Sequence, residues 1–144
     1  MRALVVAILL GASPAQAESD LSRDPPPPPA RPTIDAPLTA EAFERFVEGR
    51  TMDTHDQTGR YGVETFLPGR RAIWRDADQC LEGRWRPQGE MICFDYQGDP
   101  MSYCWTYHDR GGWLMAWLDG DRGNDPILLY PSDELVTCEG FFGV

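Results

Sequence analysis

The chain has 144 residues, and its 23 acidic side chains outnumber the 13 basic ones to give a formal net charge of −10. Because an acidic chain repels other polyanions, we expect neither nucleic acid nor an anionic membrane surface as a partner. Every basic residue is Arg, and the absence of Lys excludes chemistry that depends on a Lys amine, such as Schiff-base formation.

The N-terminus has the three parts of a secretory signal peptide. Arg2 supplies a positive charge, residues 4–10 form an apolar run, and Ala15-Gln16-Ala17 matches a cleavage site with small residues. The apolar run is shorter than the about 20 residues of a membrane-spanning helix. We therefore predict a signal peptide at 1–17, removal of which leaves no stable membrane span. The mature protein would be periplasmic or secreted, in a Gram-negative bacterium, and a short N-terminal anchor is the alternative.

Residues 18–37 are rich in proline, with an unbroken run from Pro25 to Pro29 and further prolines at Pro32 and Pro37. Each proline fixes its backbone φ angle and removes a hydrogen-bond donor, so the segment favours polyproline II or disorder over a packed core. We predict a proline-rich disordered linker here, followed by a disulfide-containing β domain at 38–144.

One amphipathic helix is expected at the start of the domain. Thr39 is a typical N-cap residue, and Gly49 marks the end of the pattern. Phe43, Phe46 and Val47 follow one another at helical spacing and share one face. This aromatic face should pack on a sheet.

Short runs of β-branched and aromatic residues follow, separated by turn residues at roughly ten-residue intervals. The expected strands are 51–55, 61–66, 71–75, 80–86, 91–96, 103–108, 113–118 and 127–130. Connections this short allow only antiparallel neighbours. Twist accumulates along such a meander and curls it. The predicted fold is mainly β, an antiparallel meander or small barrel or half-barrel of about seven or eight strands with one N-terminal helix.

The cysteines are Cys80, Cys93, Cys104 and Cys138, an even number in a chain that looks exported, which predicts two disulfide bonds. No Cys-x-x-Cys pair is present to favour a metal site. Three pairings are open. We prefer Cys80 with Cys93, on neighbouring strands of an expected hairpin, and Cys104 with Cys138, which would fix the C-terminus.

No catalytic motif stands out. His55, between Asp53 and Asp56, is the kind of histidine that can act as a base, and His108 lies at the end of an expected hairpin, but no nucleophile motif accompanies either. Several acids could form a catalytic carboxylate pair, although their positions fit a solvated outer face equally well. These acids are Glu64, Asp76, Asp78, Glu82, Glu90 and Asp95.

An acidic loop is the one weak candidate for a metal site. Asp119, Asp121 and Asp125 alternate with other residues as in a calcium loop, but Tyr130 stands where an EF-hand has its Glu. A turn rich in Asp, Asn and Gly has the same composition without a metal. We therefore expect no metal and no cofactor.

Tryptophan supplies the candidate contacts for a ligand or partner. The five residues are Trp74, Trp85, Trp105, Trp113 and Trp117. A closed barrel of eight strands can hold a small apolar ligand, and the alternative is that a domain of this size fills its own interior.

Several short motifs resemble one group of small exported proteins. They include Leu-Thr-Ala-Glu-x-Phe-Glu at the start of the domain and Tyr-Gly-x-Glu-x-Phe-Leu-Pro-Gly-Arg-Arg in its second expected strand. The matching segments are 38–44, 47–51, 61–71, 80–85, 92–96 and 104–105. Between about residues 38 and 118 the chain resembles exported alphaproteobacterial proteins of unknown function with a minimal lipocalin-like β-meander. The resemblance implies that fold and carries no catalytic residue across.

These observations predict an exported, non-catalytic binding or accessory module. Its partner would be an unknown envelope protein or a small apolar ligand, recognised through exposed aromatic residues. A small periplasmic hydrolase using His55 or a carboxylate pair is the alternative, and a structural envelope protein held at a distance by the proline-rich segment is a third.

Overall fold

A computed structural model describes residues 35–141 of the protein. The expected signal peptide and the proline-rich segment up to residue 34 lie outside the described residues. Within the described part, one helix precedes eight strands. The elements are α1 (Ala40–Val47), β1 (Thr51–Asp56), β2 (Gly59–Leu67), β3 (Arg71–Arg75), β4 (Cys80–Gln88), β5 (Met91–Tyr96), β6 (Ser102–Asp109), β7 (Leu114–Leu118) and β8 (Ile127–Ser132).

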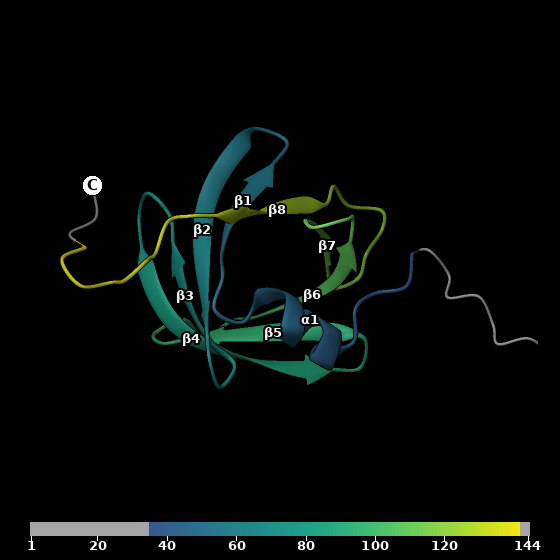
Figure 1. Cartoon of the computed structure of the whole chain (residues 1–144), viewed down its shortest axis with the longest axis horizontal. Helices are drawn as coiled ribbons and strands as arrows, with labels where there is room; N and C mark the ends of the chain where they lie inside the picture. Colours follow the sequence, from purple (N-terminus) through teal and green to yellow (C-terminus); the bar gives the residue numbers. More distant parts are fainter. Residues whose placement is uncertain (1–34, 142–144) are drawn as a thin grey trace, which may run out of the picture. The chain divides into compact units, whose positions relative to one another are not determined.

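The strands form one closed antiparallel barrel (Figure 1). Each strand pairs with the next along the chain, and β8 pairs with β1 from Thr51 opposite Ser132 to His55 opposite Leu128. Closure gives each of the eight described strands two paired neighbours, which removes the tendency of open sheets to pair with other chains. The predicted antiparallel meander is confirmed, and it closes completely.

Helix α1 begins and ends as the sequence predicts. The side chain of Thr39 accepts a hydrogen bond from the backbone N–H of Ala42 at 3.2 Å, and Gly49 leaves the helix with a φ of 76°. Phe43 and Val47 are buried. The confirmed amphipathic pattern directs these two side chains into the barrel.

Phe43 closes one end of the barrel. Its ring is fully buried, lies 4.4 Å from the ring of Tyr107, and makes edge contacts with the rings of Phe66, Trp85 and Phe94. Aromatic pairs at such distances add to the stability gained by burial.

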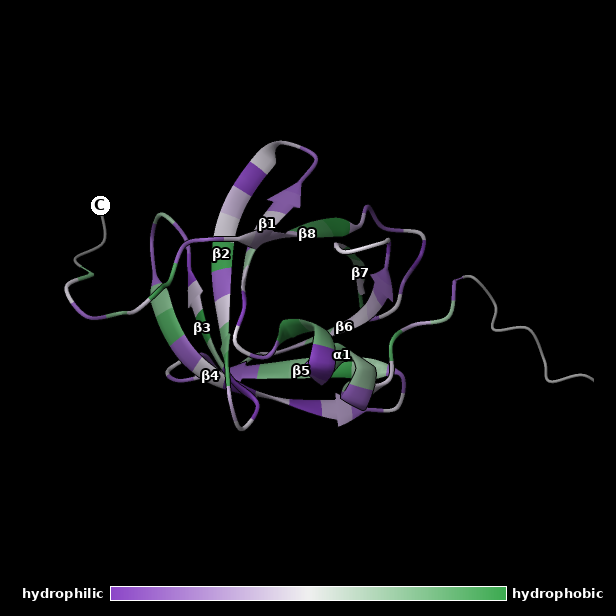
Figure 2. Cartoon of the chain, in the orientation of Figure 1, coloured by the Kyte–Doolittle hydropathy of each residue, from purple (hydrophilic) through white to green (hydrophobic). Residues whose placement is uncertain are grey.

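Alternation of hydrophilic and hydrophobic residues appears as bands of colour along β4 in Figure 2. The inward residues near α1 therefore form a filled core.

The C-terminal segment covers part of the outer surface of the barrel. Val136 is buried against Val63 and Ile73, which alternate along β2 and β3 with residues that face the interior. The backbone N–H of Val136 donates to Thr65 Oγ1 at 3.1 Å, and Thr65 is itself bonded to Thr51 at 2.7 Å. A second, smaller core thus lies outside the barrel.

The preferred disulfide pairing was wrong. The bonds join Cys80 to Cys138 and Cys93 to Cys104. In the β4–β5 hairpin, Cys93 lies opposite Arg86, and Cys80 is at the far end of β4, out of reach. Cys93 lies directly opposite Cys104 in the β5–β6 hairpin, with a Cα–Cα distance of 4.0 Å. Cys80 instead fixes the C-terminal segment to the barrel.

Two disulfide bonds indicate an oxidising environment, extracellular or periplasmic. Between residues 35 and 141, no helix has the length and apolar composition needed to cross a membrane.

Candidate functional site

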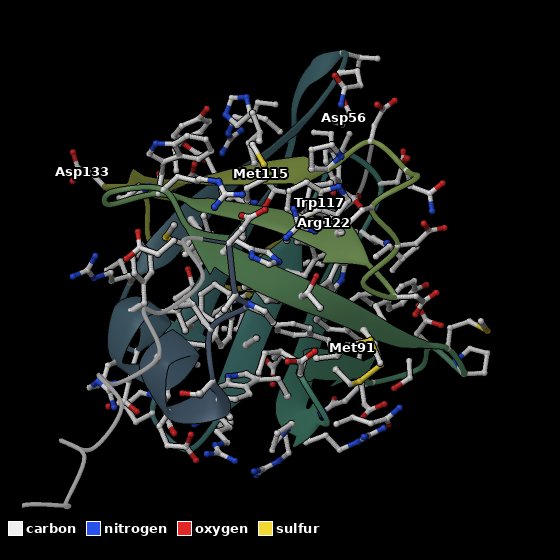
Figure 3. The ribbon with its side chains drawn as sticks, turned by 90° about the vertical axis from the view of Figure 1, so that its right-hand side faces the viewer. Asp56, Met91, Met115, Trp117, Arg122 and Asp133 are labelled. Atoms are coloured by element: carbon white, nitrogen blue, oxygen red, sulfur yellow. A yellow bond between two sulfur atoms is a disulfide. The ribbon has the colours of Figure 1, made fainter. Side chains whose placement is uncertain are left out.

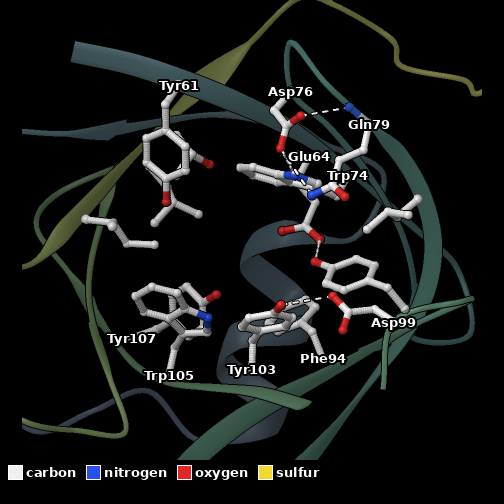
Figure 4. Close-up of a pocket in the computed structure, with 15 residues that line it drawn as sticks. Tyr61, Glu64, Trp74, Asp76, Gln79, Phe94, Asp99, Tyr103, Trp105 and Tyr107 are labelled. Atoms are coloured by element: carbon white, nitrogen blue, oxygen red, sulfur yellow. Dashed lines mark hydrogen bonds between the residues drawn. The ribbon is translucent and has the colours of Figure 1, made fainter. Parts of the chain in front are cut away.

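A cavity of about 230 Å³ lies inside the barrel at the end remote from α1 (Figure 4). Its lining comes from the later parts of β1, β3 and β5, from the earlier parts of β2, β4, β6 and β8, and from the turns that follow β3 and β5. These ends meet on one side of the barrel because neighbouring strands run in opposite directions. The contacts of Phe43 are made at the other side.

Phe94 and Tyr107 form the floor of the cavity. Both line it, and both rings also contact Phe43 on the side of α1, at 6.4 Å and 4.4 Å between ring centroids. The helix therefore closes the barrel at the bottom of the cavity, and Figure 4 shows α1 behind the cavity.

Four aromatic side chains line the walls: Tyr61, Trp74, Tyr103 and Trp105. Tyr61 and Trp74 lie 5.7 Å apart, and Tyr61 and Tyr103 remain 38% and 37% exposed. The indole of Trp74 occupies the space above Gly62, where a Cβ atom would lie 2.1 Å from the ring. Gly62 is thus required for this position of Trp74.

Three carboxylates also line the cavity, and each accepts a hydrogen bond from an aromatic side chain. The pairs are Tyr96 with Glu64 at 2.5 Å, Trp74 with Asp76 at 3.0 Å, and Tyr103 with Asp99 at 2.9 Å. Charge-assisted hydrogen bonds of this kind are stronger than neutral ones and fix both partners. The cavity is therefore acidic and its polar groups are held in place.

Glu64 is the most deeply buried of the three acids, with 5% of its surface exposed. Burial raises the pKa of Glu64 to about 7, although the hydrogen bond from Tyr96 opposes the rise. The sequence favoured a solvated outer face for this residue equally, but Glu64 alternates with Val63 and Thr65 and shares the inward side of β2 with Phe66. A solvated outer position of Glu64 is excluded.

Asp76 behaves in the opposite way. Its partial burial raises the pKa, but the backbone N–H of Asp78 and the side chains of Trp74 and Gln79 donate hydrogen bonds that together lower the pKa below the ordinary value. Two acids of one cavity therefore differ in charge near neutral pH, with Asp76 ionised and Glu64 partly protonated.

Thr54 contributes a polar atom without a partner. Its side chain lines the cavity, is 2% exposed, and its Oγ1 atom makes no hydrogen bond to any residue between 35 and 141. A buried hydroxyl without a partner costs about 1–3 kcal/mol. A ligand in the cavity could supply the missing hydrogen bond.

The tryptophans divide between the cavity and other places. Trp74 and Trp105 line the cavity, whereas Trp85 is buried beside Phe43. Trp113 stacks on Tyr130, with 5.3 Å between ring centroids. The guanidinium of Arg122 lies over the ring of Trp117, 3.9 Å from its centroid (Figure 3). Only two of the five candidate contacts therefore come together.

Neither histidine lines the cavity. His55 lies at the outer face of β1, with its ring edge against Tyr130 at 5.3 Å. His108 is buried beside Trp117 and close to Arg122, and burial and the neighbouring guanidinium lower the pKa of its ring. Asp35 accepts hydrogen bonds from Arg110 at 2.6 Å and Arg122 at 2.8 Å, so this cluster is internally paired.

The other sequence candidates lie outside the cavity. Of the six acids, only Glu64 and Asp76 line it, and Asp95 pairs with Arg86 at 3.3 Å. In the Asp119–Asp125 loop, Asp121 accepts bonds from the backbone of Gly123 and the side chain of Asn124, which are turn contacts. No group of three or more His, Cys, Asp and Glu side chains suited to a metal ion occurs in residues 35–141.

The sequence did not single out Thr54, Tyr96 and Asp99 as site residues. Alternation along the strand could have identified two of them. Thr54 is two residues from Met52 and Tyr96 is two residues from Phe94, so each points to the same side of its strand as that apolar residue. Asp99 comes from the β5–β6 turn, where alternation gives no information.

No protein-family model, curated protein or solved structure matches this chain. The resemblance to small exported alphaproteobacterial proteins stays a prediction.

Proposed function

We propose that this domain is an exported binding protein that holds one small molecule in the cavity of its barrel. The observation that carries the proposal is a cavity with aromatic walls in which polar groups converge, among them Glu64 and the unpartnered hydroxyl of Thr54. Sites for small molecules have this composition, a mostly apolar lining with a few placed polar groups.

The size of the cavity limits the ligand. Pockets for drug-sized molecules have about 300–1,000 Å³, and this cavity of about 230 Å³ is smaller. A ligand with one ring or a short chain fits. Phe94 and Tyr107 close the floor of the cavity. A ligand would therefore enter from the opposite end, beside the exposed side chains of Tyr61 and Tyr103.

Binding is tested by filling the cavity. Leu129 lines it, and the next residue toward the N-terminus, Leu128, points to the outside of the same strand. We expect 4-ethylphenol or a charged relative to bind at one site by isothermal titration calorimetry. Leu129→Phe should weaken that binding at least about tenfold, while the matched control Leu128→Phe should not. Equal binding by both variants, or none by the unmodified protein, would contradict the proposal.

Export is supported by the disulfides Cys80–Cys138 and Cys93–Cys104 together with the Ala15-Gln16-Ala17 cleavage pattern. Intact mass of the protein recovered from the periplasm of its host provides the test. We expect a chain that begins at Glu18, with no alkylation before reduction and alkylation of every cysteine after it. An uncleaved chain or free thiols would contradict export.

Hydrolysis by a carboxylate pair is the second candidate, because Glu64 and Asp76 line one cavity with pKa values displaced in opposite directions. A protonated Glu64 could act as general acid while ionised Asp76 acts as base or nucleophile. Turnover of 4-nitrophenyl glycosides that Glu64→Gln abolishes would favour this candidate, and no turnover would reject it for this substrate class.

A further inference from the structure

The charge of the cavity selects among ligands. Its charged lining residues, within the part of the chain that the structure describes, are Glu64, Asp76 and Asp99, and no Arg or His of that part lines it. A carboxylate or phosphate ligand would meet repulsion without a compensating cation. Because charge interactions strengthen away from water, this repulsion would be larger in the barrel than on its surface.

The aromatic lining adds to the same preference. Rings of Tyr61, Trp74, Tyr103 and Trp105 surround the space, and the faces of aromatic rings attract cations. Trp74 and Tyr103 already donate their polar hydrogens to Asp76 and Asp99. These hydrogens are therefore not free to bind an anion. A ligand instead meets the ring faces of Trp74 and Tyr103 and the carboxylates of Asp76 and Asp99.

Deep in the cavity, two oxygen atoms are free to accept a hydrogen bond from a ligand. Tyr96 bonds Oε1 of Glu64, which leaves Oε2 without a hydrogen bond to the described residues, and Thr54 Oγ1 has no partner among them either. An ammonium group has several N–H donors and no acceptor, so it matches these two atoms.

We propose that the ligand is a small organic cation, a primary ammonium group on a one-ring or short apolar body, with the ammonium bound at Glu64 and Thr54 between the aromatic walls. This inference rests on the proposed function and specifies its ligand class. A neutral apolar ligand would leave the hydroxyl of Thr54 and the carboxyl group of Glu64 without a further partner, and an anion would face three acidic side chains.

The bound cation should be coupled to a proton. Burial raises the pKa of Glu64 to about 7, and a cation beside it favours the ionised form. The titratable groups that share the cavity are Tyr61 from β2, Asp76 after β3, Tyr96 from β5, Asp99 from the β5–β6 turn, and Tyr103 and Tyr107 from β6. Burial raises the pKa of Tyr96 and Tyr107 far above neutrality, and that of Tyr61 to about 12. Glu64 is thus the group that releases the proton.

A series of probes with one ring and different charge tests the proposal. Tyramine is a cation, 4-ethylphenol is neutral, and 3-(4-hydroxyphenyl)propionate is an anion. We expect tyramine to bind the mature protein at least about tenfold more tightly than either relative. In buffers of different ionisation enthalpy near neutral pH, its titration should also show release of a fraction of a proton.

Glu64→Gln keeps the shape of the side chain and removes its charge. The variant should weaken tyramine about tenfold or more, abolish proton release, and change 4-ethylphenol by less than about threefold. Asp99→Asn, at the rim, should weaken tyramine in the same direction, which keeps the test valid if Glu64→Gln folds poorly. Glu90→Gln, in the exposed β4–β5 turn, is the matched control and should bind as the unmodified protein does.

The outcomes separate the two proposals. If 4-ethylphenol or the anion binds as tightly as tyramine and Leu129→Phe blocks it, the cavity function stands and the cation inference is overturned. If no member of the series binds, both are overturned. Tyramine binding that Leu129→Phe and Glu64→Gln leave unchanged would place the cation elsewhere and also overturn the inference.

Discussion

The phenol of Tyr96 donates a hydrogen bond of 2.5 Å to Oε1 of Glu64 across the interior of the barrel. The two residues lie on β5 and β2, which are not neighbours in the sheet, so closure of the barrel brings them together. A buried carboxyl group is costly unless it is bonded or protonated. Tyr96 donates one hydrogen bond to Glu64, and the raised pKa of Glu64 means that this carboxyl group is partly protonated near neutral pH.

Glu64 makes stability depend on pH. Its pKa rises from an ordinary 4.5 to about 7 in the folded protein. The stabilising contribution is therefore complete below about pH 4.5 and is lost as the pH rises through about 7. This loss amounts to about 3 kcal/mol, since one pKa unit corresponds to about 1.4 kcal/mol. Urea denaturation of the unmodified protein and Glu64→Gln should show the variant gaining relative stability between about pH 5 and about pH 8.

The control for this prediction is Glu90→Gln, which removes an exposed acid from the β4–β5 turn. Its free energy of unfolding should follow that of the unmodified protein at both pH values. A constant difference between the unmodified protein and Glu64→Gln across the pH range would show that Glu64 titrates at its ordinary pKa, and the buried position would then be wrong.

Removal of the Phe43 ring should destabilise the protein severely. The ring is fully buried among Phe66, Trp85, Phe94 and Tyr107. Phe-to-Ala substitutions at such positions cost about 3–5 kcal/mol, because they leave a cavity. The midpoint of urea denaturation measures the loss. Phe46→Ala, the same change at a half-buried position of α1, should cost clearly less, and equal losses would contradict the role of Phe43 as the end of the barrel core.

The order of elements could be predicted because each local signal agreed with the fold. Thr39 and Gly49 bound the helix, and glycine turns separate strands whose apolar residues alternate. Closure needed the pairing of β1 with β8, between segments far apart in the sequence, and no local pattern specifies it. The meander was therefore predictable, and the closed barrel was one of several outcomes.

The site was less predictable than the fold. Whether Glu64 faces the interior or the solvent depends on the register of β2, and a shift by one residue reverses every side chain. The disulfide Cys93–Cys104 had a usable signal, since a hairpin centred on the Gly98–Asp99 turn places these cysteines opposite each other. Cys80–Cys138 had none, because the C-terminal segment reaches Cys80 through packing of Val136 on the outside of the barrel.

The two disulfides should differ in their effect on stability. Cys80–Cys138 closes a loop with a sequence separation of 58, and Cys93–Cys104 one of 11. On the chain-entropy description, these loops correspond to about 4 and about 3 kcal/mol. Double replacement by Ala should lower the free energy of unfolding more for the first pair, as guanidinium denaturation measures. Peptide mapping under non-reducing conditions checks the pairing itself, and a peptide that links Cys80 to Cys93 would contradict it.

Gly62 should be needed because its lack of a side chain leaves room for Trp74 in the cavity wall, and not because β2 itself requires a glycine there. A Cβ atom at Gly62 would lie 2.1 Å from the indole of Trp74, so Gly62→Ala must displace the ring, costing about 1–3 kcal/mol as overpacking does. The Trp74→Phe background removes the far part of that ring and provides the control. There, Gly62→Ala should cost less than half as much in urea denaturation, since the clash is gone. An unchanged cost would mean that the strand itself rejects a side chain at this position, and the cavity wall would then not depend on the Gly62–Trp74 contact.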